Sequence, residues 1–369
     1  MFPSLSFSTS QQVVNRPYQE TSSRVSGSEI ISSNSKTSYN GNYGLNASWT
    51  LYNGNKRLKT IQQEKLNNQV AELDVATSEN NIQESIAQVY IQILYAAESV
   101  KVNESTLQVS IAQRDRGQEL LNAGSIAKSD FAQLEAQVST DRYQLVTAQA
   151  TLEDYKLQLK QLLELDGENE MNIYLPALSD ENVLAPLPTK KDVYIRALSL
   201  RPEIEASKLN VEASELGIGI AKSSYLPTIS LSAGIGTNHT SGSDFTFGEQ
   251  VKNGWNNSIG LSVSVPIFNN RQTKSAVQKA KLQYETSMLS LLDEQKTLYK
   301  TIEGLWLDAN SAQQRYAAAN EKLKSTQISY ELISEQFNLG MKNTIELLTE
   351  KINLLQAQQE QLQAKYMAI

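Results

Sequence analysis

Four segments of the chain alternate between apolar and polar residues with a period of two, which predicts β-strands with one apolar face. They span residues 3–8, 39–51, 227–235 and 255–267. Their polar positions are Ser, Asn, Thr or Gly and carry no charge, as the wall of a water-filled channel tolerates. Aromatic residues gather toward the strand ends, like the interfacial girdle of a membrane sheet: Tyr39, Trp49, Tyr52, Trp255 and Phe268. One such strand alone is better explained by a half-buried sheet of a soluble protein; the two features together favour a membrane sheet.

The remaining chain predicts very long helices. Residues 18–175 and 267–369 contain no proline, and the candidate breaks between 56 and 166 and beyond 271 are four glycines. These are Gly117, Gly124, Gly304 and Gly340. Apolar residues recur at the spacing of a coiled-coil seam at Ile82, Ile86, Val89, Ile93, Val100 and Leu107. If 56–121 is one helix, it is roughly 100 Å long and needs neighbours along its whole length.

The second part of the chain repeats the first without a gap. A shift of 216 residues superposes glycines of the strands, asparagines of the strand-to-helix corner and glycines of the helical turn. The superposed pairs are Gly44 with Gly260, Asn53 with Asn269, and Gly124 with Gly340. An internal duplication explains this equality, and it predicts two helices of equal length that run from corner to turn.

The duplication predicts five consecutive segments. A first β-hairpin with an extracellular loop spans 1–55, and a first long helical hairpin spans 56–168. A connection with a helix spans 169–224, a second β-hairpin with its loop spans 225–270, and a second long helical hairpin spans 271–369. We expect the two loops at 15–38 and 238–254, which are rich in small polar residues.

Four strands are too few for a closed membrane barrel, because the smallest such barrels have about eight strands and an open sheet edge is not tolerated in hydrocarbon. Several chains must therefore share one barrel. Two chains would supply eight strands and three would supply twelve. The residue patterns leave both numbers open.

Composition excludes several classes of function. The chain has no Cys, one His and a formal charge of −7, so disulfides, thiolate chemistry and a broad nucleic-acid surface are not expected. No stretch reaches the ~20 apolar residues of a transmembrane helix. We find no metal-ligand spacing, no phosphate-binding loop and no nucleophile with a base, which predicts a protein that is not an enzyme and has no cofactor or metal. His239 lies in the second expected loop and is read as incidental.

Three segments before and at the start of the third predicted strand carry a resemblance to a known family. They are LRPEI at 200–204, GIAK at 219–222 and YLPTISL at 225–231. An Arg-Pro-acidic helix start, an alanine-containing helix end and an aromatic-Leu-Pro strand entry resemble the TolC-like outer-membrane efflux proteins. The helix that family members have before the first strand lacks a counterpart before Met1, so we expect an N-terminally shortened chain.

The resemblance implies an α+β membrane protein of the outer membrane of a Gram-negative bacterium. Four strands per chain would join a shared 12-stranded β-barrel of a homotrimer, in contact with outer-membrane lipid, and long antiparallel coiled-coil helices would form a periplasmic tunnel. The protein would be a passive exit duct that receives substrates from an inner-membrane pump through a periplasmic adaptor. Nucleic acid is not an expected partner.

The resemblance also assigns roles to the two helical turns. It implies that the adaptor docks at Ala123, Gly124, Ser125, Leu339, Gly340 and Met341. Physically, a helix reversal needs a residue that accepts a positive φ, and a short side chain leaves backbone accessible to a partner. The residues alone are explained as well by a plain helical-hairpin turn.

A gate beside these turns is implied as well. Glu346 matches an acidic family position at the aperture, where three carboxylates of a trimer would favour cations. Thr349 stands at the next acidic family position, so we expect weaker selectivity. Lys342 and Asp130 match a latch that holds the tip shut, and Phe337 matches an aromatic latch position. Each of these charges taken singly is better explained as part of a solvated helix end.

Two alternatives remain. A type I protein-secretion duct would share this architecture and differ only in cargo. A soluble coiled-coil scaffold with small β elements would explain the heptads and leave the alternating strands facing water.

Overall fold

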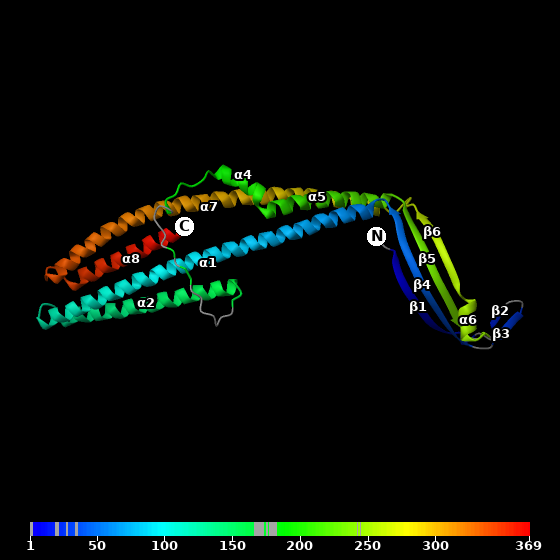
Figure 1. Cartoon of the computed structure of the whole chain (residues 1–369), viewed down its shortest axis with the longest axis horizontal. Helices are drawn as coiled ribbons and strands as arrows, with labels where there is room; N and C mark the ends of the chain where they lie inside the picture. Colours follow the sequence, from blue (N-terminus) through cyan, green and yellow to red (C-terminus); the bar gives the residue numbers. More distant parts are fainter. Residues whose placement is uncertain are drawn as a thin grey trace. The chain divides into compact units, whose positions relative to one another are not determined.

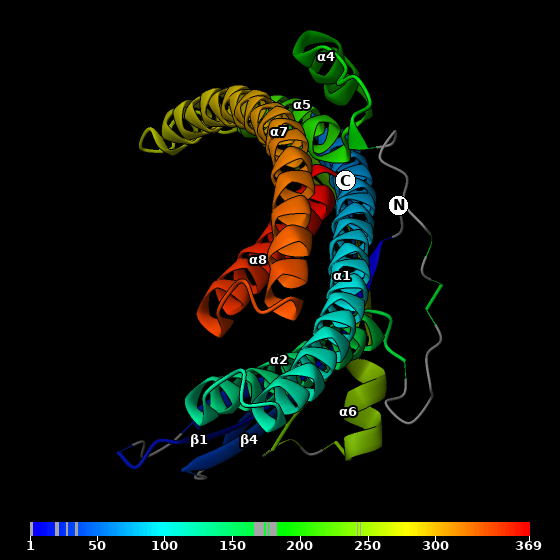
Figure 2. The same ribbon diagram turned by 90° about the vertical axis from the view of Figure 1, so that its left-hand side faces the viewer.

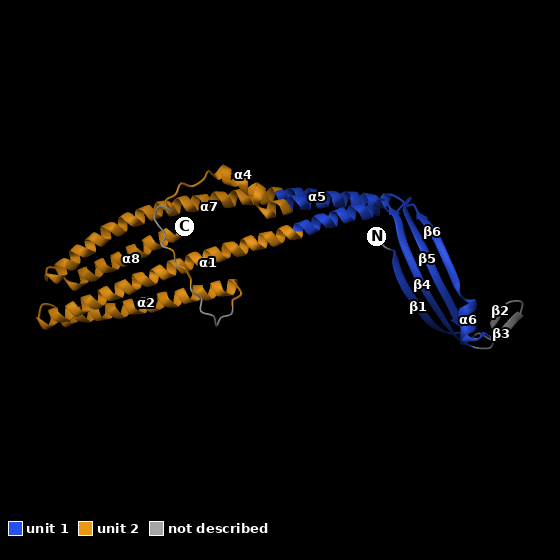
Figure 3. Cartoon of the chain, viewed as in Figure 1, with its two compact units in different colours: residues 1–70, 207–291 blue, residues 71–206, 292–369 orange. Residues whose placement is uncertain are grey.

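The computed structural model describes residues 3–18, 22–26, 29–33, 36–165, 173–174, 176, 183–241, 243 and 245–369. These form two compact units (Figure 3). Unit 1 combines residues 1–70 with 207–291, and unit 2 combines 71–206 with 292–369. The helices α1 (Lys56–Asn122), α5 (Pro202–Lys222) and α7 (Gln272–Asn338) each contribute residues to both units. The five-segment division of the chain stays a prediction.

Unit 1 holds an antiparallel sheet with the strand order β1-β4-β5-β6 (Figure 1). Its strands are β1 (Ser4–Asn15), β4 (Thr37–Asn53), β5 (Thr228–Thr240) and β6 (Asn256–Ser264). All four strands that the alternation predicts are therefore confirmed. Pairing of β4 with β5 joins the two hairpins, and β1 and β6 form the edges of the sheet within the described residues.

The register places the alternating residues on two distinct faces. One row across the sheet consists of Leu5, Ala47, Ala233 and Ile259, and the adjacent row consists of Ser6, Asn46, Gly234 and Ser258. Because neighbouring residues of a strand point to opposite faces, the first row is apolar and the second polar. Nothing in the described part of the chain covers this apolar face at its edges, where Leu5 is 68% and Ile259 79% exposed.

Both expected loops contain regular structure. The first holds two short paired strands, β2 (Ser22–Ser26) and β3 (Glu29–Ser33). In the second, β5 continues to Thr240, so His239 is a strand residue paired with Gly41, and its ring stacks on Tyr43 with 5.9 Å between centroids. The prediction that His239 lies in a loop was wrong, because the pairing of β5 with β4 extends beyond residue 235, where the apolar alternation ends.

A short helix, α6 (Phe247–Asn253), also occupies the second expected loop. Thr246 and Glu249 form a capping box: the Glu249 carboxylate accepts the Thr246 backbone N–H at 2.8 Å, and the Thr246 hydroxyl accepts the Glu249 N–H at 3.4 Å. The Thr-x-x-Glu spacing is a helix-start signal, and the loop interpretation overlooked it.

The two long helices confirm the gapless duplication. α1 and α7 each have 67 residues. Each is followed by a turn and a returning helix, α2 (Lys128–Leu162) and α8 (Thr344–Ala368). We call α1 with α2 the first hairpin and α7 with α8 the second hairpin. Figures 1 and 2 show both turns at the same end of unit 2. Gly117 and Gly304, two candidate breaks, lie inside α1 and α7.

Unit 2 has a core between its helices and the connecting segment. Leu94 of α1 packs on Leu362 and Tyr366 of α8. Beneath α4 (Lys190–Leu200), Ile204 packs on Leu298 and Ile302. None of the helices in the described ranges has both the length and the apolar character of a transmembrane helix.

The strand-to-helix corners repeat in backbone conformation. Gly54 and Asn55 have φ of 67° and 62°, and Asn270 and Arg271, at the positions related by the duplication, have 50° and 60°. Two consecutive left-handed residues turn the chain at each corner. Only the first corner uses a glycine, so the second corner holds a bulky residue in a conformation that costs ~1–2 kcal/mol.

The helical turns repeat as well. Gly124 and Gly340 have φ of 73° and 75°. The N–H of the next residue, Ser125 or Met341, donates to the carbonyl five residues earlier, at 2.8 Å in both turns. This is the Schellman ending of a helix, and it requires a left-handed residue that glycine adopts without strain.

We predict opposite effects for two substitutions at the corners. Gly54→Ala lowers the free energy of unfolding by on the order of 2 kcal/mol, because the new Cβ combines a strained φ with an approach of 2.7 Å to the Ser223 carbonyl oxygen. Arg271→Gly raises it by up to about 1 kcal/mol, because relief of left-handed strain outweighs the added chain entropy. Thermal unfolding followed by circular dichroism checks both; equal destabilisation by the two changes contradicts the corner geometry.

A second pair of substitutions tests the turn. No heavy atom lies within 4 Å of a Cβ added at Gly124 or at Gly304. The expected effects of the two substitutions therefore differ only because the backbone conformations at Gly124 and Gly304 differ. Gly124→Ala destabilises by about 1 kcal/mol because of its positive φ, and Gly304→Ala in the interior of α7 stabilises by about 1 kcal/mol through helix propensity. Denaturant unfolding measures both, and the same sign for both variants would refute this assignment.

Candidate functional site

We define the tip as residues 123–130 and 337–349, which contain both helical turns. The expected docking residues of the first turn, Ala123, Gly124 and Ser125, are exposed. In the second turn, Leu339, Gly340 and Met341 are exposed too, and two of them carry large apolar side chains. The tip thus presents accessible backbone at two glycines and apolar surface on the second turn.

Each returning helix begins with an acidic residue at the equivalent position. The Asp130 carboxylate accepts the backbone N–H of Ala127 at 3.4 Å. Likewise the Glu346 carboxylate accepts the N–H of Asn343 at 3.3 Å, and the Asn343 side chain accepts the N–H of Glu346 at 2.9 Å. Both carboxylates therefore accept the backbone N–H of the N-cap residue and interact favourably with the helix dipole.

Lys342 pairs with Glu346 in this structure. Its Nζ lies 2.5 Å from Oε1, and the two side chains are 34% and 40% exposed. The hydrogen bond from Lys342, followed by that from the Asn343 backbone, lowers the pKa of Glu346 below its ordinary value. Glu346 is therefore a carboxylate at neutral pH. Lys342 and Asp130 are not brought together within the single chain, and their latch stays a prediction.

The remaining aperture candidates differ in accessibility. Phe337 is 2% exposed, inside the chain, where it packs rather than presents a ring to a partner. Thr349 is exposed, and its hydroxyl donates to the backbone oxygen of Ile345 at 2.8 Å. Their roles in a gate stay predictions.

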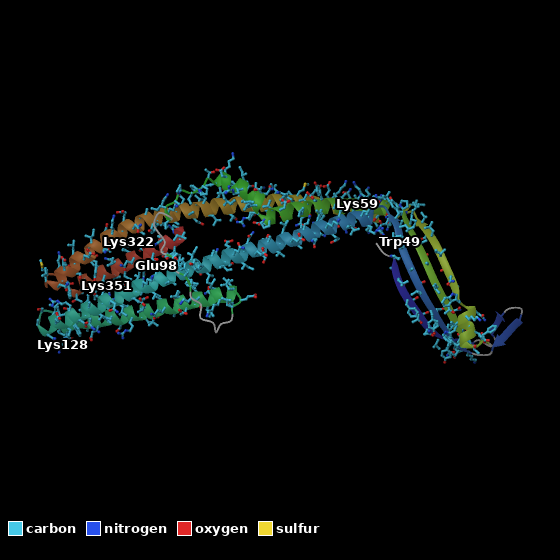
Figure 4. The ribbon with its side chains drawn as sticks, in the orientation of Figure 1. Trp49, Lys59, Glu98, Lys128, Lys322 and Lys351 are labelled. Carbon is cyan, nitrogen blue, oxygen red and sulfur yellow. The ribbon has the colours of Figure 1, made fainter. Side chains whose placement is uncertain are left out.

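The structure adds a polar cluster that sequence reasoning missed. Ser110 of α1, Asp141 of α2 and Lys351 of α8 hydrogen-bond to one another, and we call them the buried cluster. The side chains of Asp141 and Lys351 are only 2% and 5% exposed. Gln137 donates to the second carboxylate oxygen of Asp141 at 2.9 Å. Figure 4 labels Lys351 on α8.

The buried cluster is suited to holding helices together and not to catalysis. Burial lowers the pKa of Lys351, and the neighbouring Asp141 opposes that shift. A serine beside such a lysine also occurs in nucleophilic catalysis. Here, however, Ser110 is buried, so a substrate cannot reach it, and its hydroxyl donates a hydrogen bond to Asp141. Among the described residues, no group of three or more His, Cys, Asp or Glu is placed to hold a metal.

A sequence signal for this cluster does exist. Leu134 and Val138 are buried on α2, and Asp141 follows them at spacings of four and three. On α8, Lys351 follows the buried Thr344 and Leu347 at spacings of three and four. A charged residue at a seam position indicates a buried partner on another helix, although it does not identify that partner.

The sequence of this chain is similar to those of known outer-membrane proteins. The profile of the family described as "Outer membrane efflux protein" matches residues 1–164 and 193–368. Outer membrane protein TolC of Escherichia coli is 23% identical over 306 residues, covering 80% of this chain and 61% of the relative. Outer membrane efflux protein BepC of Brucella suis is 24% identical, covering 78% and 60%. The chain thus spans about three fifths of the length of these two relatives.

Other similarities extend over nearly the whole chain. Toxin and drug export protein A of Aggregatibacter actinomycetemcomitans is 21% identical, over 91% of this chain and 71% of the relative. The crystal structure of CusC, described with transmembrane channel formation, has a TM-score of 0.80 at 20% identity and covers all of this chain and 80% of its own. The Campylobacter jejuni outer membrane channel CmeC has a TM-score of 0.75 at 18% identity, covering 100% and 75%.

The solved structures confirm the predicted fold, and the family profile covers most of the sequence. The family consists of outer-membrane channels and not of enzymes, which confirms the non-enzymatic prediction. The chain therefore belongs to the outer membrane efflux protein family and is a protein of the outer membrane of a Gram-negative bacterium.

Proposed function

We propose that the chain is one subunit of a homotrimeric passive exit duct, which receives substrates from an inner-membrane pump through a periplasmic adaptor. The sheet carries this proposal: it exposes a continuous apolar face and leaves β1 and β6 as open edges within the described residues. Lipid suits the apolar face. The open edges need strands of neighbouring chains, because unpaired backbone groups cost several kcal/mol each in hydrocarbon.

The number of chains follows from strand counting and resemblance together. Two copies would give a barrel of eight strands and three would give twelve. The resemblance to the TolC-like proteins favours three. The uncharged polar face of Ser6, Asn46 and Ser258 would then line the lumen, and substrates would pass without chemical change.

The helices support a tunnel that continues from the barrel. At 67 residues, α1 and α7 are each roughly 100 Å long, which is far beyond the length of ordinary globular helices. Apolar residues remain exposed on α2 in a helical pattern, at Tyr143, Val146 and Leu157. In a trimer these side chains would pack against helices of the next chain.

The tip is the proposed docking place for the adaptor. Its two Schellman turns expose backbone at Gly124 and Gly340, and Leu339 and Met341 add apolar surface. A helical hairpin of the adaptor would contact the exposed backbone at the glycines and the apolar side chains beside them. Glu346, as a carboxylate near the turn, is the proposed source of cation preference at the aperture.

A type I protein-secretion duct is the second candidate, and one observation favours it. The relative from Aggregatibacter is named for export of both toxins and drugs. The cargo of this chain would then include polypeptides. A soluble coiled-coil scaffold does not fit membership of an outer-membrane family.

The proposed duct predicts a sharp difference between two neighbouring strand residues. Ile259→Arg places a charge on the lipid-facing side of β6 and costs about 2–4 kcal/mol, so membrane insertion falls strongly. Ser258→Arg places the same charge in the lumen, so insertion persists and conductance changes. Membrane fractionation and planar-bilayer recording measure these effects. Wild-type protein that stays in the soluble fraction, or that forms no channel, would exclude the duct.

Glu346→Gln is predicted to lower the preference for cations, measured as a shift of the reversal potential in a salt gradient. Because the hydrogen bond from Lys342 holds the pKa of Glu346 below its ordinary value, the wild-type preference persists as the pH falls from neutral and is lost only below the range in which a free Glu carboxyl titrates. Glu360→Gln is the matched control, since Glu360 also lies on α8 and pairs with a lysine, Lys322, at 2.6 Å. If the reversal potential is unchanged in Glu346→Gln, Glu346 does not lie at the aperture.

A further inference from the structure

We infer that the buried cluster selects the neighbour of the first hairpin during assembly: it accepts a second hairpin and rejects the first hairpin of another copy of this chain. Asp141 and Lys351 form the accepted contact, and Glu135 makes the wrong contact unfavourable. The inference rests on the proposed homotrimer, in which the hairpins of all chains form a ring. First and second hairpins alternate in that ring, so identical hairpins do not become neighbours.

The cluster joins charges from the two sides of the contact between hairpins. Lys351 of α8 donates to Asp141 of α2 and to Ser110 of α1, so its ammonium contacts both helices of the first hairpin. The side chains of Asp141 and Lys351 are almost fully buried. A buried ion pair adds little net stability, whereas loss of either partner leaves an uncompensated charge in the interior. Such a pair therefore discriminates between partners through the cost of the wrong one.

A second contact defines the surface of the first hairpin that takes part. Gln113, three residues beyond Ser110 on α1, donates to the Tyr330 hydroxyl of α7 at 2.7 Å. Residues three apart lie on the same side of a helix, so α7 and α8 both approach this side of α1. We call Ser110, Gln113 and Asp141 the receiving face of the first hairpin.

The duplication identifies the residues that would meet in any other pairing of hairpins. Both hairpins have the same helix-turn-helix backbone, so an equivalent contact brings equivalent positions together. The pairs related by 216 residues are Ser110 with Thr326, Asp141 with Ala357, and Lys351 with Glu135. The second hairpin therefore has no acidic residue at the position of Asp141, and the first hairpin has a carboxylate where the second has an ammonium.

Burial in the single chain agrees with this equivalence. On α8, Leu347 and Lys351 are buried. Their equivalents on α2 are more accessible, because Phe131 is half-buried and Glu135 is exposed. The face that α8 turns to the first hairpin is thus uncovered on α2. In the ring this face of α2 meets the second hairpin of the next chain.

Each pairing of identical hairpins is unfavourable for its own reason. A first hairpin against another first hairpin would place Glu135 beside Asp141, and two carboxylates at a buried site repel each other. A second hairpin against another second hairpin would place Lys351 beside Ala357, which leaves a buried ammonium without a partner.

The remaining contact, between neighbouring chains, avoids both penalties. It places Glu135 beside Thr326 and Ala357, where no like charge opposes it and the Thr326 hydroxyl is a hydrogen-bond donor. Alternation of first and second hairpins is therefore the arrangement in which Lys351 keeps its carboxylate and Glu135 meets no other one.

The test detects wrong pairing with a cross-link between chains. The protein has no cysteine, so Gln113→Cys in one copy and Arg114→Cys in a second, co-expressed copy introduce one thiol each. Position 114 is the equivalent of Tyr330, so the two thiols meet only when two first hairpins pair. In an alternating ring a second hairpin separates them. A short bismaleimide applied to membranes should therefore give little covalent dimer with the native charges, as measured by denaturing electrophoresis.

Glu135→Lys in both copies should increase the covalent dimer by at least about fivefold, because an ammonium then enters the receiving face beside Asp141. Glu153→Lys is the matched control. It makes the same charge change on α2, at an exposed site where Glu153 pairs with Lys156 at 2.7 Å, and should leave the amount of dimer unchanged. Equal amounts of dimer in the two variants would overturn the inference.

A charge exchange separates pairing specificity from stability. Asp141→Lys with Lys351→Glu restores an ion pair, so a purely stabilising role predicts the native amount of dimer. Under the inference the dimer rises, because Glu135 now meets an ammonium, and it falls again when Glu135→Lys is added. A native amount of dimer in the exchanged variant contradicts the pairing role. If the exchanged variant does not fold, Glu135→Lys decides alone, since Glu135 is exposed.

Size-exclusion chromatography in detergent distinguishes failure of the inference from failure of the proposed function. A wild-type chain that forms no trimer contradicts the proposed homotrimer. A trimeric wild type, with the same amount of cross-linked dimer in Glu135→Lys as in Glu153→Lys, contradicts only the inference.

Discussion

A strand at the edge of a sheet exposes a row of backbone N–H and C=O groups, and hydrocarbon offers no partner for them. In this chain the rows lie on β1 and β6, beside a face on which Leu5 and Ile259 are exposed. Pairing with strands of other chains satisfies the edges, and lipid covers the apolar face. The number of chains in the barrel then sets the number of helices in the tunnel, so the architecture depends on this one constraint.

The duplication is the second organising feature, and it is preserved in conformation more strictly than in residue type. Both corners use two consecutive left-handed residues, although one has Gly54 and Asn55 and the other has Asn270 and Arg271. Both turns use glycine with a Schellman ending. α1 and α7 have the same length, so each repeat has the same number of helical residues between its corner and its turn.

The two repeats have the same backbone conformation but differ in their charged residues. Asp130 and Glu346 both cap their helices, yet only Glu346 has a lysine within hydrogen-bonding distance, at Lys342. The buried pair of Asp141 and Lys351 has no counterpart at Ala357 and Glu135. Two hairpins with the same backbone can therefore differ in how firmly each contact is held.

The amino-acid sequence by itself determined the strands, the long helices, the turns and their repetition, because alternation, absence of proline and glycine placement are local signals. It did not predict that pairing carries β5 to His239, since the cross-strand partner Gly41 is far away in sequence. Tertiary structure alone buried Phe337 and assembled Ser110, Asp141 and Lys351 from three helices. Each of these depends on which helix faces are brought together, and a coiled-coil pattern specifies that a seam exists but not which residues meet across it.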